Sequence, residues 1–225
     1  MRKIAVAIDG PAAAGKSTIA KKVAEQLGMV YIDTGAMYRA FTWYCMHKGI
    51  NCEDEQACCA VIPEVKIELK PDRVVLCNGI DVTKAIRMSD VSFNVSFIAT
   101  YKDIRLALVE LQRQMAEHDP VIMDGRDIGT YVLPNAEVKI FQIASVECRA
   151  KRRFDENVEK GIPCTMEEIE EDVRRRDYID SHRDFAPLKQ AEDAICLDTS
   201  DMTIEEVVAE VIRIINNKIE ELEGR

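Results

Sequence analysis

The chain has 225 residues, a formal net charge of −10 at pH 7 and a hydrophobic fraction of 47%. This length favours one core with insertions over two independent domains, and the acidic balance disfavours a nucleic-acid-binding surface, which needs a basic face. No stretch approaches the roughly 18 consecutive apolar residues of a membrane span or the pattern of a signal peptide. We therefore expect a cytoplasmic protein that binds neither nucleic acid nor a membrane, and a monomer because no apolar stripe or repeat demands a partner.

The first predicted element is a buried strand at residues 4–8, which leads into a glycine-rich loop. The loop matches the phosphate-loop pattern of Gly, four residues, then Gly-Lys-Ser. Gly10 and Gly15 let consecutive N–H groups curl around a polyphosphate, Lys16 can reach the β- and γ-phosphates, and the Ser17 hydroxyl can hold a magnesium ion. The predicted nucleotide site comprises Gly10, Pro11, Ala12, Ala13, Ala14, Gly15, Lys16, Ser17 and Thr18.

A helix with one apolar face follows the loop, and Gly28 is placed to end it. Because strand, loop and helix all agree with the setting of a phosphate loop, a chance glycine-rich turn is disfavoured. A second strand at 30–32 runs into residues 33–39, and residues just past the carboxyl end of a strand line the ligand crevice in open α/β sheets. Thr34 and Arg39 are therefore candidate ligand groups, on a helix expected to reach about Lys48.

The hydrophobic period changes to that of strands between residues 65 and 82. Residues 65–69 alternate, 70–73 form a turn, 74–77 form a second strand, and Asn78-Gly79 is a hairpin signal before a third strand at 80–82. Such a small antiparallel sheet does not belong to a parallel series. We therefore predict an insertion over residues 34–100.

Eight cysteines raise the alternatives of disulfides or zinc, but none forms a Cys-x-x-Cys pair and several lie in apolar runs. Reduced, mostly buried thiols are favoured. The cluster from Cys45 to Cys59 is the only one with a spacing that leaves metal binding open.

The rest of the chain returns to alternating helices and strands. A helix is expected at 101–117 with Ile104, Leu108, Leu111 and Met115 inside, then strands at 121–123, 138–143 and 195–197, and a final helix opened by a Thr203–Glu206 capping box. Five short strands alternating with helices predict an α/β fold with a doubly wound parallel sheet. Its core would comprise residues 1–33, 101–145 and 184–225.

Residues 146–183 form a predicted hairpin of two polar helices, joined at 160–163, that few buried contacts would hold down; we predict a mobile lid. Arg149, Arg152 and Arg153 share one helix face, and Arg176, Asp180 and Arg183 share another. These faces favour transfer between two bound phosphate compounds. The alternatives are a solvated basic face and, for Asp180, a bridge between Arg176 and Arg183 in water.

The sequence offers no catalytic base beside the loop, because His47, His118 and His182 do not follow strand ends. A phosphate monoester acceptor is already anionic, so catalysis would reduce to positioning and charge neutralisation. Arginine suits that work because its planar fork binds phosphate bidentately. The only near match to a guanine-specific motif, at 217–220, lies in the last helix with the wrong final residue.

Four motifs together resemble the bacterial-type cytidylate kinases, which are P-loop nucleoside monophosphate kinases. They are residues 10–17, 33–39, 124–130 and Arg176-Asp177-x-x-Asp180-x-x-Arg183, in the same order and over nearly the whole chain. The resemblance implies a P-loop kinase fold with a helical lid. It also implies reversible transfer of the γ-phosphoryl group of MgATP to CMP or dCMP.

The resemblance also implies residue roles. ATP would be held by the loop with Arg149 and Arg153, and its Mg²⁺ by Ser17, with Asp124 orienting magnesium waters or instead capping the turn at Gly125. The CMP site would use Thr34, Arg39, Arg126 and Arg183 for the phosphate end, Ser96, Arg105 and Asp127 for the base, and Arg176 with Asp180 for the ribose. The catalytic set would be Lys16, Arg126, Arg176 and Arg183.

Two rival functions remain. One is a kinase of another small acceptor, such as UMP or shikimate, and Asp127 is the discriminating residue because a carboxylate would repel the uracil O4. The other is a non-catalytic ATP-binding module, which would not need a second anion site.

Overall fold

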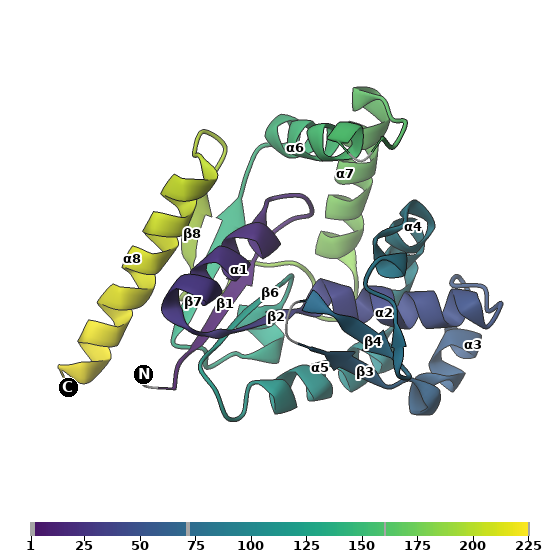
Figure 1. Ribbon diagram of the computed structural model, residues 1–225, viewed down its shortest axis with the longest axis horizontal. Helices are drawn as coiled ribbons and strands as arrows, with labels where there is room; N and C mark the ends of the chain where they lie inside the picture. The colour runs from purple at the N-terminus through teal and green to yellow at the C-terminus, as the bar shows by residue number, and fades with distance from the viewer. Residues whose placement is uncertain (1–2, 71–72, 160, 225) are drawn as a thin grey trace. The chain divides into compact units, whose positions relative to one another are not determined.

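The computed structural model describes residues 3–70, 73–159 and 161–224, and the chain forms two compact units (Figure 1). The first unit contains Met1–Tyr31 with Ala116–Arg225, and the second contains Ile32–Met115. The insertion was predicted to end at residue 100, whereas the second unit extends to Met115. The next helix, which we assigned to the core, belongs to the second unit because it packs on a helix of that unit. Residues 146–183 belong to the first unit.

The predicted five-stranded parallel sheet is confirmed. Its strands are β1 (Ala5–Asp9), β2 (Val30–Asp33), β6 (Val121–Gly125), β7 (Val138–Ile143) and β8 (Ile195–Asp198), in the order β2-β6-β1-β7-β8. Asp9 pairs in register with Gly125 of β6 and with Phe141 of β7. The carboxyl ends of β1 and β6 therefore meet at one edge of the sheet, where the segments after them carry the glycine-rich loop and the pair Arg126 and Asp127.

Helices α1 (Lys16–Leu27) and α8 (Ile204–Glu223) pack together and against the apolar residues of β1, β6 and β7. Gly28 ends α1 in the left-handed conformation, with φ +64°. The Thr203–Glu206 capping box at the start of α8 is present as predicted. The near match to a guanine motif lies inside α8, and not after a strand.

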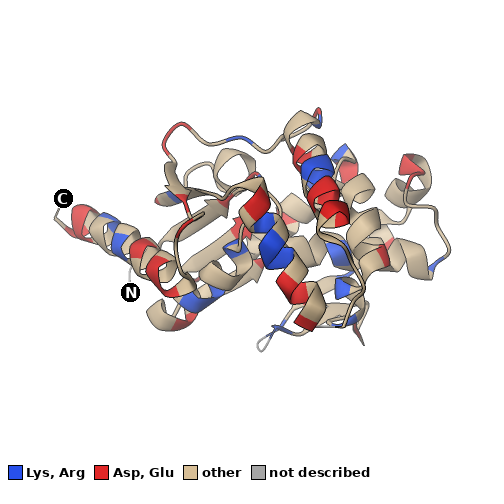
Figure 2. Ribbon diagram, turned by 90° about the horizontal axis from the view of Figure 1, so that it is seen from above, with Lys and Arg blue, Asp and Glu red and all other residues tan. Residues whose placement is uncertain are grey.

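The polar helical hairpin consists of α6 (Val146–Glu159) and α7 (Met166–His182), which pack side by side. Their apolar contact is small, with Ala150, Ile169 and Val173 at its centre. A Thr165–Glu168 capping box opens α7. Lys160 of the predicted connection lies outside the described residues. Figure 2 shows basic and acidic residues interleaved along the helices, so the arginine-rich segments carry acidic residues as well.

The second unit surrounds the predicted three-stranded antiparallel sheet, in the order β3-β4-β5. Asn78 and Gly79 form its hairpin turn with φ +50° and +79°, and Pro71 and Asp72 of the other predicted turn lie outside the described residues. Its elements are α2 (Thr34–His47), α3 (Glu55–Ala60), β3 (Ile67–Leu69), β4 (Val75–Cys77), β5 (Ile80–Asp81), α4 (Ser89–Ile98) and α5 (Lys102–Met115), with short 3-10 turns at Ile62–Glu64 and Ala85–Arg87.

The buried face of α5 differs from the predicted stripe. Ile104 and Leu108 are buried, but Leu111 and Met115 are half-buried and line a hollow beside β3. The inner face instead includes Arg105 and Gln112, which are each 1% exposed. Sequence periodicity missed this shift because it counts polar side chains as outward-facing.

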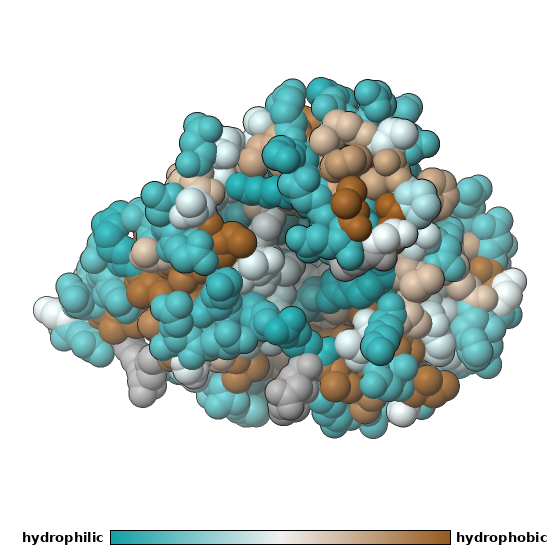
Figure 3. All heavy atoms as spheres, turned by 45° about the horizontal axis from the view of Figure 1, so that its top comes forward, coloured by the Kyte–Doolittle hydropathy of each residue, from teal (hydrophilic) through white to brown (hydrophobic). Residues whose placement is uncertain are grey.

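All eight cysteines are free thiols, four of them buried, and burial raises the pKa of Cys52 to about 11. Across residues 3–70, 73–159 and 161–224, no group of three or more His, Cys, Asp or Glu side chains is arranged to hold a metal ion. In the same ranges no helix is both long and apolar enough to span a membrane. The face drawn in Figure 3 is mostly hydrophilic, with apolar side chains in separate patches.

Candidate active site

The loop between β1 and α1 has the backbone conformation that its glycines predict. Gly15 has φ +88° directly before α1, and Gly10 has φ +151°. A Cβ at Gly10 would lie 2.0 Å from the carbonyl oxygen of Gln142 in β7. Gly10 is therefore required both by its backbone conformation and by the close approach of the loop to β7.

Replacing Gly10 by alanine is expected to lower the free energy of unfolding by about 3 kcal/mol, because backbone in β7 would have to move. Gly49 is a matched control: its φ is +72°, yet nothing lies within 4 Å of its missing Cβ, so Gly49→Ala should cost only about 1 kcal/mol. Urea denaturation of the two variants provides the measurement. Equal losses would show that the contact with Gln142 is unimportant.

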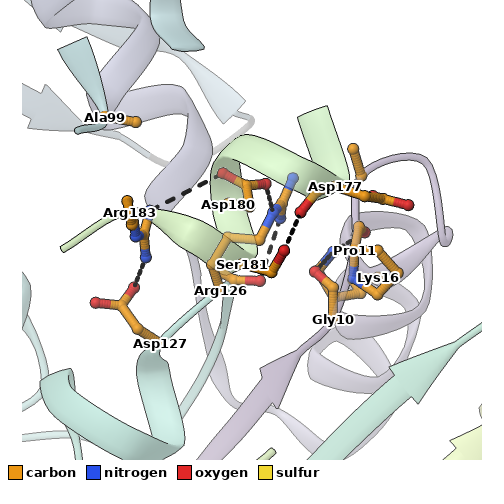
Figure 4. Close-up of polar contacts among 12 residues, drawn as sticks. Gly10, Pro11, Lys16, Ala99, Arg126, Asp127, Asp177, Asp180, Ser181 and Arg183 are labelled. Carbon is orange, nitrogen blue, oxygen red and sulfur yellow. Dashed lines mark hydrogen bonds and ion pairs between the residues drawn. The ribbon is translucent and has the colours of Figure 1, made fainter. Parts of the chain in front are cut away.

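The loop carbonyls are held by side chains from three elements. Lys16 Nζ donates to the carbonyls of Gly10 (2.8 Å) and Pro11 (2.7 Å), as Figure 4 shows. Arg149 Nη1 donates to Ala12 (3.1 Å), while Gln142 Nε2 (2.6 Å) and Arg152 Nη1 (3.2 Å) donate to Ala14. Gln142 and Arg152 are absent from the predicted site. Their only sequence signals are a polar residue in a mostly apolar strand and membership of the arginine cluster.

Lys16 is 4% exposed, so its charge is almost fully removed from water. Burial lowers its pKa well below the usual value, the nearby Arg126 cation lowers it further, and Asp124 and Asp9 act in the opposite direction. Two cations close together in a dry site favour an anion between them. This environment therefore suits a phosphate group.

Ser17 and Asp124 come together at the start of α1. Ser17 Oγ donates to Asp124 Oδ2 at 2.7 Å, and the Tyr31 hydroxyl donates to Asp124 Oδ1 at 2.7 Å. Hydroxyl and carboxylate oxygens are the donor set that hard divalent cations prefer. The pair thus fits the predicted metal role, and Tyr31, which has no motif to identify it, orients the carboxylate.

Four charged residues from the loop after β6 and from the C-terminal end of α7 form a network (Figure 4). Arg126 Nε donates to Asp180 Oδ2 at 2.8 Å, and Arg183 lies 3.5 Å from Asp127 and 4.0 Å from Asp180. Burial alone would raise the pKa of Asp180, but Arg126 and Arg183 outweigh it and lower the pKa. The network brings together residues predicted to bind phosphate, base and ribose.

The alternative for Asp180, a bridge in water between Arg176 and Arg183, agrees with the structure in one partner, since Arg183 lies 4.0 Å from Asp180, but differs in the other partner and in its setting. Asp180 contacts Arg126 instead of Arg176, and its side chain is only 15% exposed. Arg176 nevertheless lies close enough to the network for the charge of Arg126 to act on it. Burial and, after it, this charge lower the pKa of Arg176. Helix spacing placed the residues of α7 correctly but could not reveal a partner on another element.

The two arginines predicted for ATP have different surroundings. Arg149 is 3% exposed and binds Asp177 through two bonds of 3.0 and 2.6 Å, which tie α6 to α7. Arg153 is half-buried and lies 3.4 Å from Glu156 on the same helix. In this structure Arg149 therefore braces the loop and the hairpin, and Arg153 has no comparable role among its described contacts.

Asp9 is a further buried carboxyl, which the sequence analysis did not select. It accepts hydrogen bonds from the backbone N–H groups of Ile128 (2.8 Å) and Gly129 (2.7 Å). Burial raises its pKa to about 6, against the effect of these two bonds. The folded state therefore favours the protonated form more than the unfolded state does.

Asp9 is expected to make stability fall as the pH rises between about 4 and 6. A native pKa raised above the unfolded value of 3.8 stabilises the fold at low pH, and this contribution, about 3 kcal/mol, is lost as the pH rises through 6. Urea denaturation of the wild type and of Asp9→Asn between pH 4 and 7 isolates the effect. The stability difference between them should change across this window, and a constant difference would contradict the shifted pKa.

The predicted residues of the second unit gather on α2, α4 and α5. The guanidinium of Arg105 lies over the Tyr38 ring, 5.3 Å from its centre, and Nη1 donates to the Ala99 carbonyl at 2.9 Å. Ser96 is 7% exposed, and its Oγ has no hydrogen-bond partner in the described parts of the chain. A buried hydroxyl without a partner is costly, which is consistent with a ligand contact there. Thr34 is buried at the start of α2.

Arg39 folds back along α2 toward the start of the helix. A Cβ on Gly35 would lie 3.3 Å from both Arg39 Nη1 and Asp33 Oδ1. Asp33 caps the helix by accepting from the Ala36 N–H at 2.8 Å and also accepts from Arg87 at 2.7 Å. The absence of a side chain at Gly35 therefore leaves room for the Arg39 guanidinium.

Comparisons with solved structures describe the fold. An uncharacterized protein from Eubacterium ventriosum superposes with a TM-score of 0.55, covering 95% of this chain and 99% of that one at 13% identity. A gluconokinase from Sinorhizobium meliloti gives 0.53, covering 99% and 98% at 13% identity. At this identity the likeness concerns the fold alone.

Sequence comparisons are closer. Cytidylate kinases from Anoxybacillus flavithermus and Geobacillus kaustophilus are 53% and 52% identical, each over 97% of this chain and 99% of the relative. That of Bacillus subtilis is 48% identical over 96% of this chain and 98% of its own. A family model described as cytidylate kinase matches residues 6–217. The family model and these relatives cover nearly the whole chain, including its phosphate loop and its arginine–aspartate network. The chain belongs to the cytidylate kinase family.

Proposed function

We propose that the protein transfers the γ-phosphoryl group of ATP to CMP or dCMP, giving ADP and CDP or dCDP. The observation that carries this proposal is that one unit of this cytidylate kinase family member combines a phosphate loop with a second set of cations, one buried and one half-buried. Lys16 serves the first and Arg126 and Arg183 serve the second. A non-catalytic ATP-binding module would need only the first.

The loop and its lysine bind the phosphates of ATP. When phosphate enters, Lys16 exchanges the carbonyls of Gly10 and Pro11 for phosphate oxygens, so its donors stay satisfied. Kinases of this kind act with ATP and a divalent metal, and we propose Mg²⁺, with Ser17 as an oxygen donor and Asp124 orienting the waters of the metal. The metal neutralises charge on the transferring phosphoryl group.

The CMP phosphate is bound by Arg126 and Arg183, with Arg39 of α2 as a further donor. Asp180 holds Arg126 through a charge-assisted bond, and phosphate can replace that carboxylate while keeping the buried guanidinium compensated. Asp180 is then available, with Arg176, for the ribose. No proton has to leave the acceptor, because a phosphate monoester is anionic at neutral pH.

The base is read by Asp127 together with Ser96 and Arg105. Cytosine presents an exocyclic amine where uracil presents O4, so a carboxylate accepts from the first and repels the second. Thr34 completes the proposed CMP contacts. The assignments of Arg149 and Arg153 to ATP, of the α6–α7 hairpin to a closing lid, and of a monomer in the cytoplasm remain predictions.

ADP formation from MgATP is the first test, with CMP, dCMP, UMP, AMP or shikimate supplied one at a time and a control without acceptor. We expect strong turnover with CMP and dCMP. Turnover only with another acceptor would discard the base-reading roles and keep a P-loop kinase, and none with any acceptor would revive the binding module.

Asp127→Ala is expected to reduce discrimination between CMP and UMP by about tenfold or more, because the contact that distinguishes the amine from O4 is removed. The measurement is kcat/KM for both acceptors at saturating MgATP. Asp201→Ala, an exposed carboxylate in the turn before α8, is a control that should leave the ratio unchanged. Equal losses for CMP and UMP in Asp127→Ala would contradict the role.

A further inference from the structure

Asp9 lies between the phosphate loop and the segment that carries Asp127. It is the last residue of β1 and directly precedes Gly10. Its Oδ1 accepts from the Ile128 N–H and its Oδ2 from the Gly129 N–H, at 2.8 and 2.7 Å. A single carboxylate therefore holds two consecutive backbone donors of a segment that is 119 residues away in the chain.

The segment that it holds is a π-helical turn, Ile128–Val132, which starts directly after Asp127. The Asp127 carbonyl accepts from the N–H groups of Tyr131 (2.8 Å) and Val132 (3.0 Å), so the Asp127 backbone belongs to the same turn. The Asp127 side chain is 5% exposed and faces Arg183. The direction of this side chain thus depends on how the turn is seated.

Packing at Gly129 seats the turn closely against β1 and β7. A Cβ on Gly129 would lie 3.3 Å from Asp9 Oδ2 and 3.2 Å from Cδ of Lys139. Lys139 is itself held by Asp193 and by the Pro134 carbonyl, at 2.8 and 2.6 Å. The turn therefore sits between a carboxylate with two bonds to it and a lysine stem that is fastened at its far end.

We infer that Asp9 is a positioning residue for acceptor specificity, which seats the 128–132 turn so that the Asp127 carboxylate faces the acceptor base. This inference rests on the proposed base-reading role of Asp127. Asp9 touches neither substrate; it acts through the backbone of the turn. Burying a carboxylate costs free energy. The two hydrogen bonds from Asp9 to the 128–132 turn offset part of this cost and hold the turn in place.

The test is a double-mutant cycle read out as the ratio of kcat/KM for CMP to that for UMP. Asp9→Asn keeps the shape but replaces one acceptor oxygen with an amide donor, which opposes one of the two N–H groups. We expect the ratio to fall about tenfold while KM for ATP stays within about twofold. In an Asp127→Ala background, Asp9→Asn should change the ratio by less than about twofold, because Asp9 acts through Asp127.

Asp198→Asn is the matched control. Asp198 ends β8 and also accepts two hydrogen bonds from the turn that follows, from the N–H and Oγ of Ser200, but it does not touch the 128–132 turn. Its replacement should leave the CMP-to-UMP ratio unchanged. A similar loss of discrimination in this variant would overturn the inference, because the effect would then not be specific to Asp9.

A second variant keeps the test decisive where Asp9→Asn unfolds. Gly129→Ala leaves both carboxylates in place but pushes the turn from Asp9, and its ratio should fall in the same direction. An unchanged ratio in whichever folded variant is assayed, or equal effects with and without Asp127, would overturn the inference. If Asp127→Ala alone leaves the ratio unchanged, the base-reading proposal fails as well, so the two failures are distinguishable.

Discussion

Replacing Lys16 by alanine is expected to lower kcat by about 10²–10³-fold with every acceptor, because it removes a buried cation from the transferring phosphoryl group. The same change also removes the brace from Lys16 Nζ to the Gly10 and Pro11 carbonyls. ADP formation with CMP and dCMP at saturating ATP is the measurement. The loss should appear in kcat for both acceptors alike, since the lysine acts on the donor phosphate.

Lys22→Ala is the matched control for this variant. Lys22 lies on the same helix, α1, but its side chain is 46% exposed and 4.0 Å from Glu205, so its removal should leave kcat unchanged. Retention of more than about a tenth of wild-type kcat in Lys16→Ala would contradict the role of Lys16 in stabilising the transferred group. A loss with only one of the two acceptors would point to the acceptor site instead.

Replacing Arg126 by alanine is expected to lower kcat/KM for CMP by about 10²–10³-fold while KM for ATP changes little. The guanidinium is the proposed bidentate ligand of the acceptor phosphate, and lysine cannot reproduce its planar fork. The variant also leaves Asp180 buried without Arg126, which should cost about 3 kcal/mol of stability. Steady-state kinetics for both substrates, with urea denaturation, separate the two effects.

The double variant Arg126→Ala/Asp180→Asn distinguishes phosphate binding from a structural ion pair. Removing both partners should recover most of the lost stability, because no buried charge is left unpaired. Measured against Asp180→Asn alone, because Asp180 is itself a proposed ribose contact, the loss of kcat/KM should remain if Arg126 binds phosphate. Recovery of activity together with stability would mean that Arg126 only supports Asp180. Arg213→Ala, an exposed ion-pair partner of Glu210 on α8, controls for the loss of a surface arginine.

Helix and strand positions in both units followed from local signals. Glycine at Gly28 and Gly79, the capping boxes at Thr165 and Thr203, and the change of period near residue 65 each act within a few residues of themselves. Such signals can be read from the sequence without knowing which residues are neighbours in the folded protein. The phosphate loop belongs to the same class, because its glycines, lysine and serine are contiguous.

Pairings across the chain were beyond these signals. Arg126 and Asp180 are 54 residues apart, and α-helical spacing suggested partners on α7 alone. Tyr31 of β2 contacts Asp124 and Gln142 of β7 contacts the phosphate loop, but nothing in the local sequence pattern identifies either residue. The sequence also could not assign the helix at 102–115, which lies in the second unit, because its amphipathic pattern fits either unit.

By itself, the sequence determined the order of elements, the nucleotide loop and the family motifs, because each depends on residues close together in the chain. Only the tertiary structure decided which buried charges meet. Asp9 illustrates the reason: its two hydrogen bonds reach backbone N–H groups that no side-chain pattern encodes. Its burial, which raises its pKa to about 6, exists only once β1 lies inside the sheet.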